Sequence, residues 1–433
     1  MWTSDPAQTP GNLTCPFCGL ACDDLSVAPG PADAGLVLVN GCQTARGAFA
    51  GAMAAGPGTA LIKGQPVSLE AALAHAAGLL AAARAPLFGG LVTDVNGMRA
   101  VLELADRCGA LLDHVGADAL FRNLLVLQDG GWMTATLTEV RNRADLILIL
   151  GREVPHRFPR LCERVLLPPE ALFSPPGERR LVLLGPAEPG PLPAEFAAAN
   201  PTLIPVALAD LAGVGALLRG LIAGRPVRAD AIPGVAGAQL KQLAGWLCGA
   251  RYAVVTWAAG ELAFPHAELT VQAFVELVRD LNRTTRAAAL PLAGTLGDLT
   301  ANQVCTWQTG YPLRSGRQQG RSCYEPLLYR HQDLLAQGQS DLLLWVQALP
   351  AANPAATPAA KCPTIVLGYP GLACGRVPEV FIPVGLPGID HPGHWYRTDA
   401  VCPLPLGQVR DLGLASVAGV IGKLSERLGA TAE

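Results

Sequence analysis

Residues 136–151 read T-L-T-E-V-R-N-R-A-D-L-I-L-I-L-G, a short helical pattern followed at once by an unbroken run of leucine and isoleucine. The helical part covers residues 138–143, and the apolar run covers residues 145–151. A strand without polar alternation is buried on both faces, which is typical of a parallel sheet covered by helices on each side. This stretch therefore predicts an α/β fold.

The same alternation extends along the chain in both directions. Ser68 can cap a helix that runs to about Arg84, a strand follows at residues 86–92, and a helix at residues 96–108 ends at Gly109. This repeated order indicates parallel sheets that are covered by helices on both faces. A hairpin is expected at residues 60–67, with Gly64 at its turn. Further strands are expected at residues 110–113, 181–185, 202–206, 252–257, 341–346 and 364–368, and further helices at 208–223, 237–248, 266–282 and 415–428.

Four cysteines lie close to the beginning of the chain, at Cys15, Cys18, Cys22 and Cys42. Their spacing is C-x2-C-x3-C, then nineteen residues, then C. Four soft thiolate ligands can hold one [4Fe–4S] cluster, and the alternatives are a structural zinc ion or a vestigial, empty site. The other eight of the twelve cysteines show no ligand spacing, so we expect core or loop thiols there.

Length and composition limit the class of protein. A chain of 433 residues is too long for one core, and we expect a cysteine lobe at residues 1–57 and α/β regions at 58–200 and 201–433. The formal charge of −3 gives no reason to expect binding to nucleic acid or to an anionic membrane. No secretory signal and no long apolar run is visible, so a cytoplasmic protein with reduced thiols is expected.

Several motifs together resemble one family. They are C-P-F-C-G-L-A-C-D-D-L at 15–25, the stretch at 136–151, R-F-P-R-L at 157–161, N-Q-V-C-T-W-Q-T-G-Y-P at 302–312 and G-H-W-Y-R-T-D-A-V at 393–401. This set resembles the B-type subunit of formylmethanofuran dehydrogenase, in the molybdopterin oxidoreductase superfamily. The resemblance implies Rossmann-like parallel-sheet lobes of the molybdopterin oxidoreductase type with a small N-terminal cysteine lobe. It also implies a [4Fe–4S] cluster in the first motif, beside a bis-pterin molybdenum or tungsten centre.

The chain departs from the family at the metal centre. Family enzymes carry a cysteine or selenocysteine ligand in the turn after the first buried strand, and Val95 stands at that position here. Valine has no donor atom. The family's Cys-His-Gly-Pro segment is also missing, and His114 is expected to be a half-exposed loop histidine, not its remnant. We therefore expect molybdenum or tungsten and molybdopterin to be absent.

A degenerate B-type subunit with such a loss occurs in the bacterial formyltransferase/hydrolase complex. The resemblance implies a non-redox subunit that assembles with hydrolase, transferase and C-like subunits. That complex releases formate from formyl-tetrahydromethanopterin by way of a methanofuran-type carrier. Two rival hypotheses are an active formylmethanofuran dehydrogenase subunit and an electron-transfer subunit that holds only the cluster.

A former pterin cavity would lie at the carboxyl ends of the strands, where doubly wound sheets bind their ligands. Two segments could line such a cavity, and each has a competing interpretation. The segment that begins at residue 151 could instead be a charged loop that contacts other subunits. Residues 302–312 could instead be a polar loop with satisfied hydrogen bonds, packed with Trp307 and Tyr311. The residual candidates are Thr93, Gly151, Arg152, His156, Asn302 and Gln303, and the candidate fillers of the cavity are Phe121, Arg122 and Trp132.

Overall fold

The computed structural model describes residues 13–30, 35–187, 191–318, 320–350 and 357–430. These described residues form two compact units, the first from those up to residue 117 together with those from residue 294 onward, and the second from those between 118 and 293. The boundaries differ from the three consecutive segments that we expected. The reason is that the first unit pairs strands from both ends of the chain, and composition does not show which distant strands pair.

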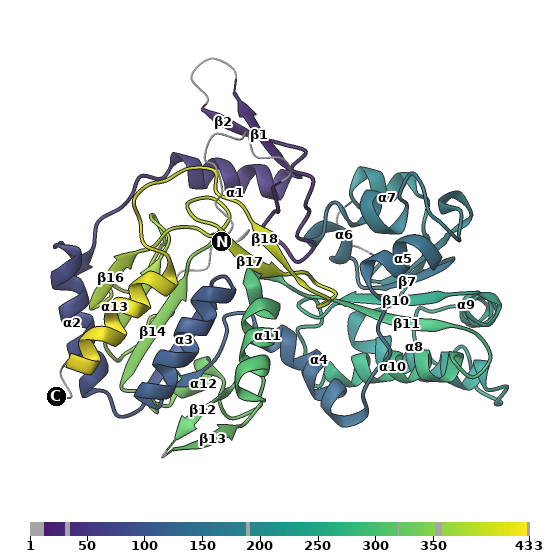
Figure 1. Cartoon of the computed structure of the whole chain (residues 1–433). Coiled ribbons are helices and arrows are strands. Elements are labelled where there is room, and N and C mark those ends of the chain that lie inside the picture. Colours follow the sequence, from purple (N-terminus) through teal and green to yellow (C-terminus); the bar gives the residue numbers. More distant parts are fainter. Residues whose placement is uncertain (1–12, 31–34, 188–190, 319, 351–356, 431–433) are drawn as a thin grey trace. The chain divides into compact units, whose positions relative to one another are not determined.

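The first unit contains a nine-stranded sheet in the order β13-β12-β6-β5-β14-β15-β16-β3-β4 (Figure 1). Its central strands are parallel, and they are β6 (Leu111–Leu112), β5 (Pro86–Val92), β14 (Leu342–Gln347), β15 (Thr364–Gly368) and β16 (Val380–Pro383). Antiparallel strands extend both edges, namely β12 (Ser315–Gln318), β13 (Arg321–Tyr324), β3 (Leu61–Ile62) and β4 (Gln65–Pro66). β5, β14 and β15 are buried along their whole length, as their apolar sequences predicted.

Helices cover this sheet, and α13 contacts both α2 and α3 (Figure 1). Ser68 caps α2, Asp94 caps α3, and Gly109 ends α3 in the left-handed conformation. Two antiparallel pairs complete the unit, β1 (Ser26–Pro29) with β2 (Leu36–Val39) and β17 (Gly393–Tyr396) with β18 (Pro403–Leu406). The helices are α1 (Gln43–Ala54), α2 (Leu69–Ala82), α3 (Val95–Cys108), the 3₁₀ turn η4 (Thr295–Gly297), α11 (Asp298–Thr309), α12 (His331–Ala336) and α13 (Val417–Ala430).

The second unit is built on a five-stranded, all-parallel sheet in the order β11-β10-β7-β8-β9. The strands are β7 (Leu146–Leu150), β8 (Arg180–Gly185), β9 (Thr202–Pro205), β10 (Ala253–Ala258) and β11 (Ala287–Leu292). The helical segments are α4 (Ala117–Gly130), α5 (Leu137–Arg143), α6 (Val154–Arg157), η1 (Cys162–Leu166), η2 (Pro176–Glu178), α7 (Ala194–Ala198), η3 (Leu208–Asp210), α8 (Leu211–Ile222), α9 (Gly237–Gly249) and α10 (Glu268–Leu281).

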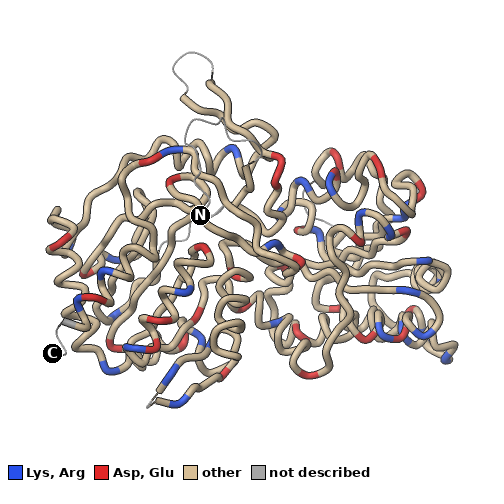
Figure 2. Tube along the Cα trace, viewed as in Figure 1, with Lys and Arg blue, Asp and Glu red and all other residues tan. Residues whose placement is uncertain are grey.

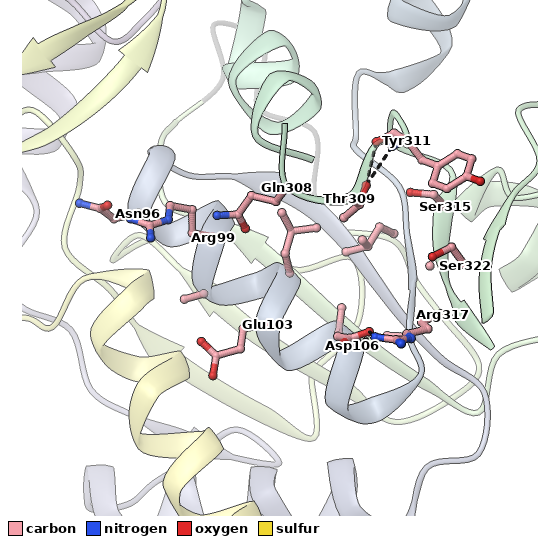
Figure 3. A pocket seen from close by; sticks show the side chains of 16 residues that line it. Asn96, Arg99, Glu103, Asp106, Gln308, Thr309, Tyr311, Ser315, Arg317 and Ser322 are labelled. Atoms are coloured by element: carbon pink, nitrogen blue, oxygen red, sulfur yellow. Dashed lines mark hydrogen bonds and ion pairs between the residues drawn. The ribbon is translucent and has the colours of Figure 1, made fainter. Parts of the chain in front are cut away.

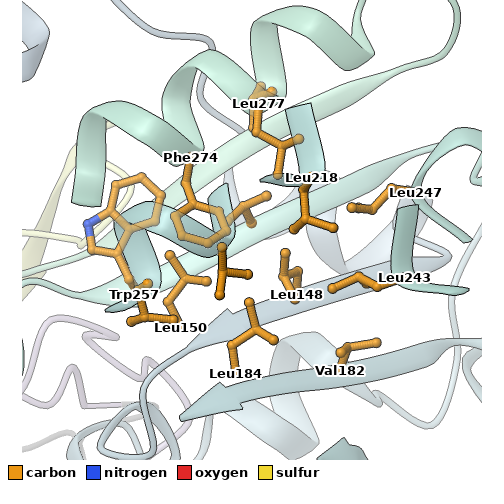
Figure 4. Close-up of a cluster of buried hydrophobic side chains, with 14 of the residues drawn as sticks. Leu148, Leu150, Val182, Leu184, Leu218, Leu243, Leu247, Trp257, Phe274 and Leu277 are labelled. Carbon is orange, nitrogen blue, oxygen red and sulfur yellow. The ribbon is translucent and has the colours of Figure 1, made fainter. Parts of the chain in front are cut away.

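Apolar side chains between this sheet and its helices form the core of the second unit (Figure 4). Trp257 of β10 and Phe274 of α10 are both fully buried there. The indole Nε1–H of Trp257 donates to Asn123 Oδ1 at 2.9 Å, so the polar atom of this large side chain is satisfied. Because β7 and β10 are parallel neighbours, the loops that follow them lie at the same edge of the sheet.

The charged side chains are spread over both units. Figure 2 shows lysine and arginine interspersed with aspartate and glutamate along the coloured part of the trace. Among the described residues, every helix is too short or too polar to cross a lipid bilayer.

Candidate functional site

The N-terminal cysteine loop is held by its own backbone. Cys15 N–H donates to Cys22 O at 2.8 Å, and Ala21 N–H donates to Cys18 O at 3.2 Å. All three cysteines of this loop are buried. Cys42 is the N-cap of α1, where its Sγ accepts from Ala45 N–H at 3.4 Å. The turn and the helix therefore bring four cysteines into one lobe.

Burial and the neighbouring thiols change the acidity of the first two cysteines. Burial, and next the neighbouring Cys18, raises the pKa of Cys15 well above its usual value. Burial, and next Cys22, raises the pKa of Cys18 to about 12. A bound cationic cluster would reverse this effect, since metal ligation deprotonates a thiol.

A [4Fe–4S] cluster takes four thiolate ligands, and Cys15, Cys18, Cys22 and Cys42, all free thiols, would be those ligands here. In the described part of the chain, no three His, Cys, Asp or Glu side chains are close enough together to hold one metal ion. A four-iron cluster is larger than one ion, and its ligand sulfurs stand further apart.

Two segments that are distant in the sequence pack against the cysteine loop. Gly294 approaches it so closely that an added Cβ would lie 2.6 Å from Gly19 Cα. Thr398 N–H donates to Gly19 O at 2.7 Å. The motifs at residues 15–25 and 393–401, far apart in the sequence, are thus neighbours in the first unit.

The position at which the resemblance implies a metal ligand lies in the turn after β5. Val95 is the first residue of α3 and is partly exposed, whereas Thr93 and Asp94 are buried. The Asp94 carboxylate accepts from Gly97 N–H at 3.1 Å and from Asn96 N–H at 3.3 Å, so it caps the helix. An isopropyl group at residue 95 offers no ligand atom. The residues of this turn therefore do not fit a protein-ligated bis-pterin metal centre.

His114 is fully buried, so the prediction of a half-exposed loop histidine was wrong. Its Nε2 donates to Leu296 O at 3.0 Å, and its Nδ1 accepts from Gly116 N–H at 2.8 Å. Burial lowers the pKa of His114 to about 4, so the ring is neutral near pH 7. The covering loop comes from residues far along the chain, which local sequence does not reveal.

Asp298, at the start of α11, is a second buried titratable group beside His114. An added Cβ at Gly116 would lie 3.3 Å from His114 Nδ1 and 3.6 Å from Asp298 Cβ. The carboxylate accepts from Gly294 N–H and from Leu299 N–H, both at 2.6 Å. Burial nevertheless raises the pKa of Asp298 to about 7.

These two groups should make opposite contributions to the pH dependence of stability. Between pH 6.5 and about 4 the unfolded chain binds a proton at residue 114 that the folded chain does not bind, so this histidine destabilises the fold as pH falls. Between pH 3.8 and about 7 the folded chain binds a proton at Asp298 that the unfolded chain has lost, so this carboxyl destabilises the fold as pH rises. At about 1.4 kcal/mol per pKa unit, each contribution is on the order of 3 kcal/mol.

We expect His114→Gln to gain stability relative to the wild type as pH falls from 6.5 to 4.5. Asp298→Asn should lose stability relative to the wild type over the same interval. Urea midpoints at the two pH values measure both differences. Differences of the same sign in the two variants would contradict the opposite assignments.

Asn302 and Gln303 lie in α11, so the prediction of a polar loop at residues 302–312 was wrong for most of that segment. Asn302 is buried, and its Oδ1 accepts from Leu313 N–H at 3.2 Å. Gln303 is partly exposed, and Trp307 is 63% exposed. Asn302 therefore holds the chain after the helix, and Trp307 lies at the surface instead of packing inside a loop.

The candidates after residue 150 belong to the second unit. Gly151 is buried, Arg152 is partly buried and His156 is exposed, and the three follow the carboxyl end of β7.

The residues that we expected to fill a former cavity are also in the second unit. Phe121 is buried, Arg122 Nη1 donates to Ala259 O at 2.8 Å, and the Trp132 ring meets Trp257 edge-on at 6.2 Å. Sequence reasoning missed Glu261, whose carboxylate binds the turn after β7.

A groove of about 660 Å³ lies on the first unit, between α3, the end of α11 and β12 (Figure 3). Arg317 Nη1 lies 3.0 Å from both carboxylate oxygens of Asp106 on its wall. Arg99, also on the wall, stacks its guanidinium over the Trp307 ring at 5.9 Å. The groove lining includes Asn96, next to Val95, and none of the four N-terminal cysteines.

Sequence comparisons identify relatives of this chain among known proteins. No family model matches it. It is 33% identical over 329 residues to the B-type subunit of the formyltransferase/hydrolase complex Fhc from Methylorubrum extorquens, covering 76% of this chain and 85% of that protein. It is 28% identical over 414 residues to the B-type subunit of a tungsten-containing formylmethanofuran dehydrogenase from Methanocaldococcus jannaschii, covering 92% of this chain and 93% of that protein.

Solved structures agree with these relatives. The crystal structure of the formyltransferase/hydrolase complex FhcABCD from Methylorubrum extorquens, with methylofuran, matches with a TM-score of 0.73 and 28% identity, over 86% of this chain and 99% of that one. Acetylene hydratase from Pelobacter acetylenicus matches with a TM-score of 0.63 over 97% of this chain and 69% of that one, at 10% identity, which shows the fold alone.

The fold is therefore α/β, of the molybdopterin oxidoreductase type, as the sequence predicted. Within that class, the chain belongs to the family of the formylmethanofuran dehydrogenase B-type subunits, which includes the corresponding subunit of the formyltransferase/hydrolase complex.

Proposed function

We propose that this chain is a non-redox B-type subunit of a formyltransferase/hydrolase complex. The complex would release formate from formyl-tetrahydromethanopterin through a methanofuran-type carrier. The observation that carries the proposal is Val95, a side chain without a donor atom at the start of α3. The relative that is 33% identical is a subunit of such a complex, and its solved structure contains methylofuran.

The role proposed for this chain is structural. Formyl transfer and formyl hydrolysis need no electron transfer, so a subunit without pterins can serve as a scaffold. Its partners would be hydrolase, transferase and C-like subunits, which would carry the reacting groups. The fold itself, with its buried parallel sheets, supplies a rigid surface for those contacts.

Growth without molybdate and tungstate tests the proposal. The complex is purified from cells grown with and without these oxyanions, and formate release from formyl-tetrahydromethanopterin is measured. We expect equal activity per complex from the two cultures. Activity that falls in parallel with molybdenum or tungsten content would contradict the non-redox role.

The rival function is that of an active dehydrogenase subunit. The tungsten-containing relative from Methanocaldococcus jannaschii covers nearly the whole chain, which favours this alternative. It requires formate-dependent reduction of a viologen dye by the purified complex. We expect no such reduction, because residue 95 supplies no metal ligand.

We also propose that Cys15, Cys18, Cys22 and Cys42 hold a [4Fe–4S] cluster. The spacing of the cysteines and their placement in one lobe support this assignment. Cys18→Ser should then lower the iron content of anaerobically purified protein and lower its melting temperature. Cys248→Ser, at an exposed cysteine in the second unit, is the matched control and should change neither. If Cys18→Ser had unchanged iron content and unchanged stability, the assignment of a cluster to these cysteines would be wrong.

A further inference from the structure

The sheet of the second unit reverses its strand order beside β7. From β7 the chain builds β8 and β9 on one side, and then returns to build β10 and β11 on the other. In doubly wound sheets, ligands bind at the carboxyl ends of the strands where the order reverses. That point lies between β7 and β10, so the turns at residues 151–153 and 259–261 flank it.

The carboxylate of Glu261 occupies this point. Arg152 N–H donates to Glu261 Oε1 at 2.8 Å, and Glu153 N–H donates to Glu261 Oε2 at 3.0 Å. Two successive backbone N–H groups that converge on one anion form a nest, the arrangement that binds phosphate in many proteins. The turn after β7 is therefore built around a negative charge.

Gly151 makes the close approach of this carboxylate feasible. Its φ is 86°, in the left-handed region that favours glycine. An added Cβ would lie 2.0 Å from Glu261 Oε2, so the carboxylate would have to leave this position. The glycine after β7 and the glutamate after β10 thus form one matched pair, although 110 positions separate them in the sequence.

Arg157 and the carboxylates of Glu153 and Glu261 lie around the nest. Arg157 comes close to the glutamate's own turn, since an added Cβ at Gly260 would lie 3.2 Å from Arg157 Nη1. Arg157 Nε also lies 3.6 Å from Glu153 Oε2, which balances one of the two carboxylates. Burial, the largest effect, raises the pKa of Glu261 above its usual value, although its two backbone hydrogen bonds lower it; the Glu153 carboxylate raises it further and Arg157 lowers it.

We propose that residues 151–153 form an anion-binding nest whose resident anion is the Glu261 carboxylate, and that this carboxylate closes the nest to phosphate-bearing ligands. A phosphate and the carboxylate compete for the same two N–H groups, so both do not bind at once. The wild-type chain leaves no place there for the phosphate of a nucleotide or dinucleotide. The inference goes beyond the proposed function, because it depends neither on Val95 nor on the cysteines.

Phosphate binding by Glu261→Ala tests this inference. The melting temperature of the full chain is measured against inorganic phosphate, with sodium chloride at matched ionic strength as the reference. Glu261→Ala should show a saturable rise, whereas the wild type should show none. Glu170→Ala, which removes an exposed glutamate of the same unit, is the control and should behave as the wild type. A folded Glu261→Ala variant that responds no more than the control would overturn the inference.

Glu261→Gln provides a second test that does not depend on the alanine variant being folded. Glutamine keeps the shape of the side chain, but its NH₂ group faces one of the two backbone N–H donors, those of Arg152 and Glu153. That N–H then has no acceptor. The amides of Arg152 and Glu153 should then exchange with solvent several-fold faster than in the wild type. Unchanged exchange at both amides would also overturn the inference. Neither test measures metal content or formate release, so failure here leaves the proposed function unaffected.

Discussion

Replacing Asp113 with alanine is expected to lower the free energy of unfolding by about 3–5 kcal/mol, because it removes a buried carboxylate that pairs with a buried arginine. Asp113 Oδ1 accepts from Arg314 Nε at 3.2 Å, and Oδ2 lies 2.7 Å from His331 Nδ1. Asp113 is 0% exposed, Arg314 is 2% exposed and His331 is 4% exposed. A guanidinium so deeply buried is strongly destabilising once its partner is lost.

The measurement is urea unfolding of the two proteins at the same pH. Asp106→Ala serves as the control, because Asp106 makes a similar pair with Arg317 at the surface. That variant should lose less than about 1 kcal/mol, since solvent screens an exposed pair. Equal losses in the two variants would show that burial of the Asp113 group does not matter.

Gly294→Ala should be nearly as destabilising, at roughly 3 kcal/mol or more, because it adds a backbone collision to a strained conformation. The φ of Gly294 is 91°, and the added Cβ would lie 2.6 Å from Gly19 Cα. A backbone atom cannot move aside like a flexible side chain, so the cysteine loop must shift. We therefore also expect lower iron content in this variant if the lobe holds a cluster.

Gly310→Ala is the control, because it has the same kind of backbone strain without the collision. Its φ is 80°, but an added Cβ would meet no atom within 4 Å. This control should lose only the strain energy of a left-handed alanine, on the order of 1–2 kcal/mol. Equal melting temperatures for the two variants would contradict the close packing of residue 294 on the cysteine loop.

Much of the fold could be predicted from local pattern. The apolar runs that became β5, β7, β10, β14 and β15 were predicted as buried strands, and the segments that became α2, after the Ser68 cap, and α3, before Gly109, were predicted as helices. β11 was missed, because A-A-A-L-P-L lacks branched residues and contains Pro291. α11 was taken for a loop, because its polar Asn302 and Gln303 gave no apolar periodicity.

Candidate site residues could be named from the sequence where they form a motif. The spacing of four cysteines and the valine after β5 are both visible in the chain alone. The contacts that bury His114 and that place Glu261 against residues 152 and 153 were not, because each joins segments more than a hundred residues apart. Those contacts depend on strand order, which no local pattern encodes.

Elemental and pterin analysis of the purified complex tests the central claim most directly. Molybdenum, tungsten and pterin are measured per copy of this chain, in a preparation that releases formate. The account predicts active complex with molybdenum and tungsten far below one atom per chain and with no pterin. One molybdenum or tungsten atom with two pterins in each copy would contradict it.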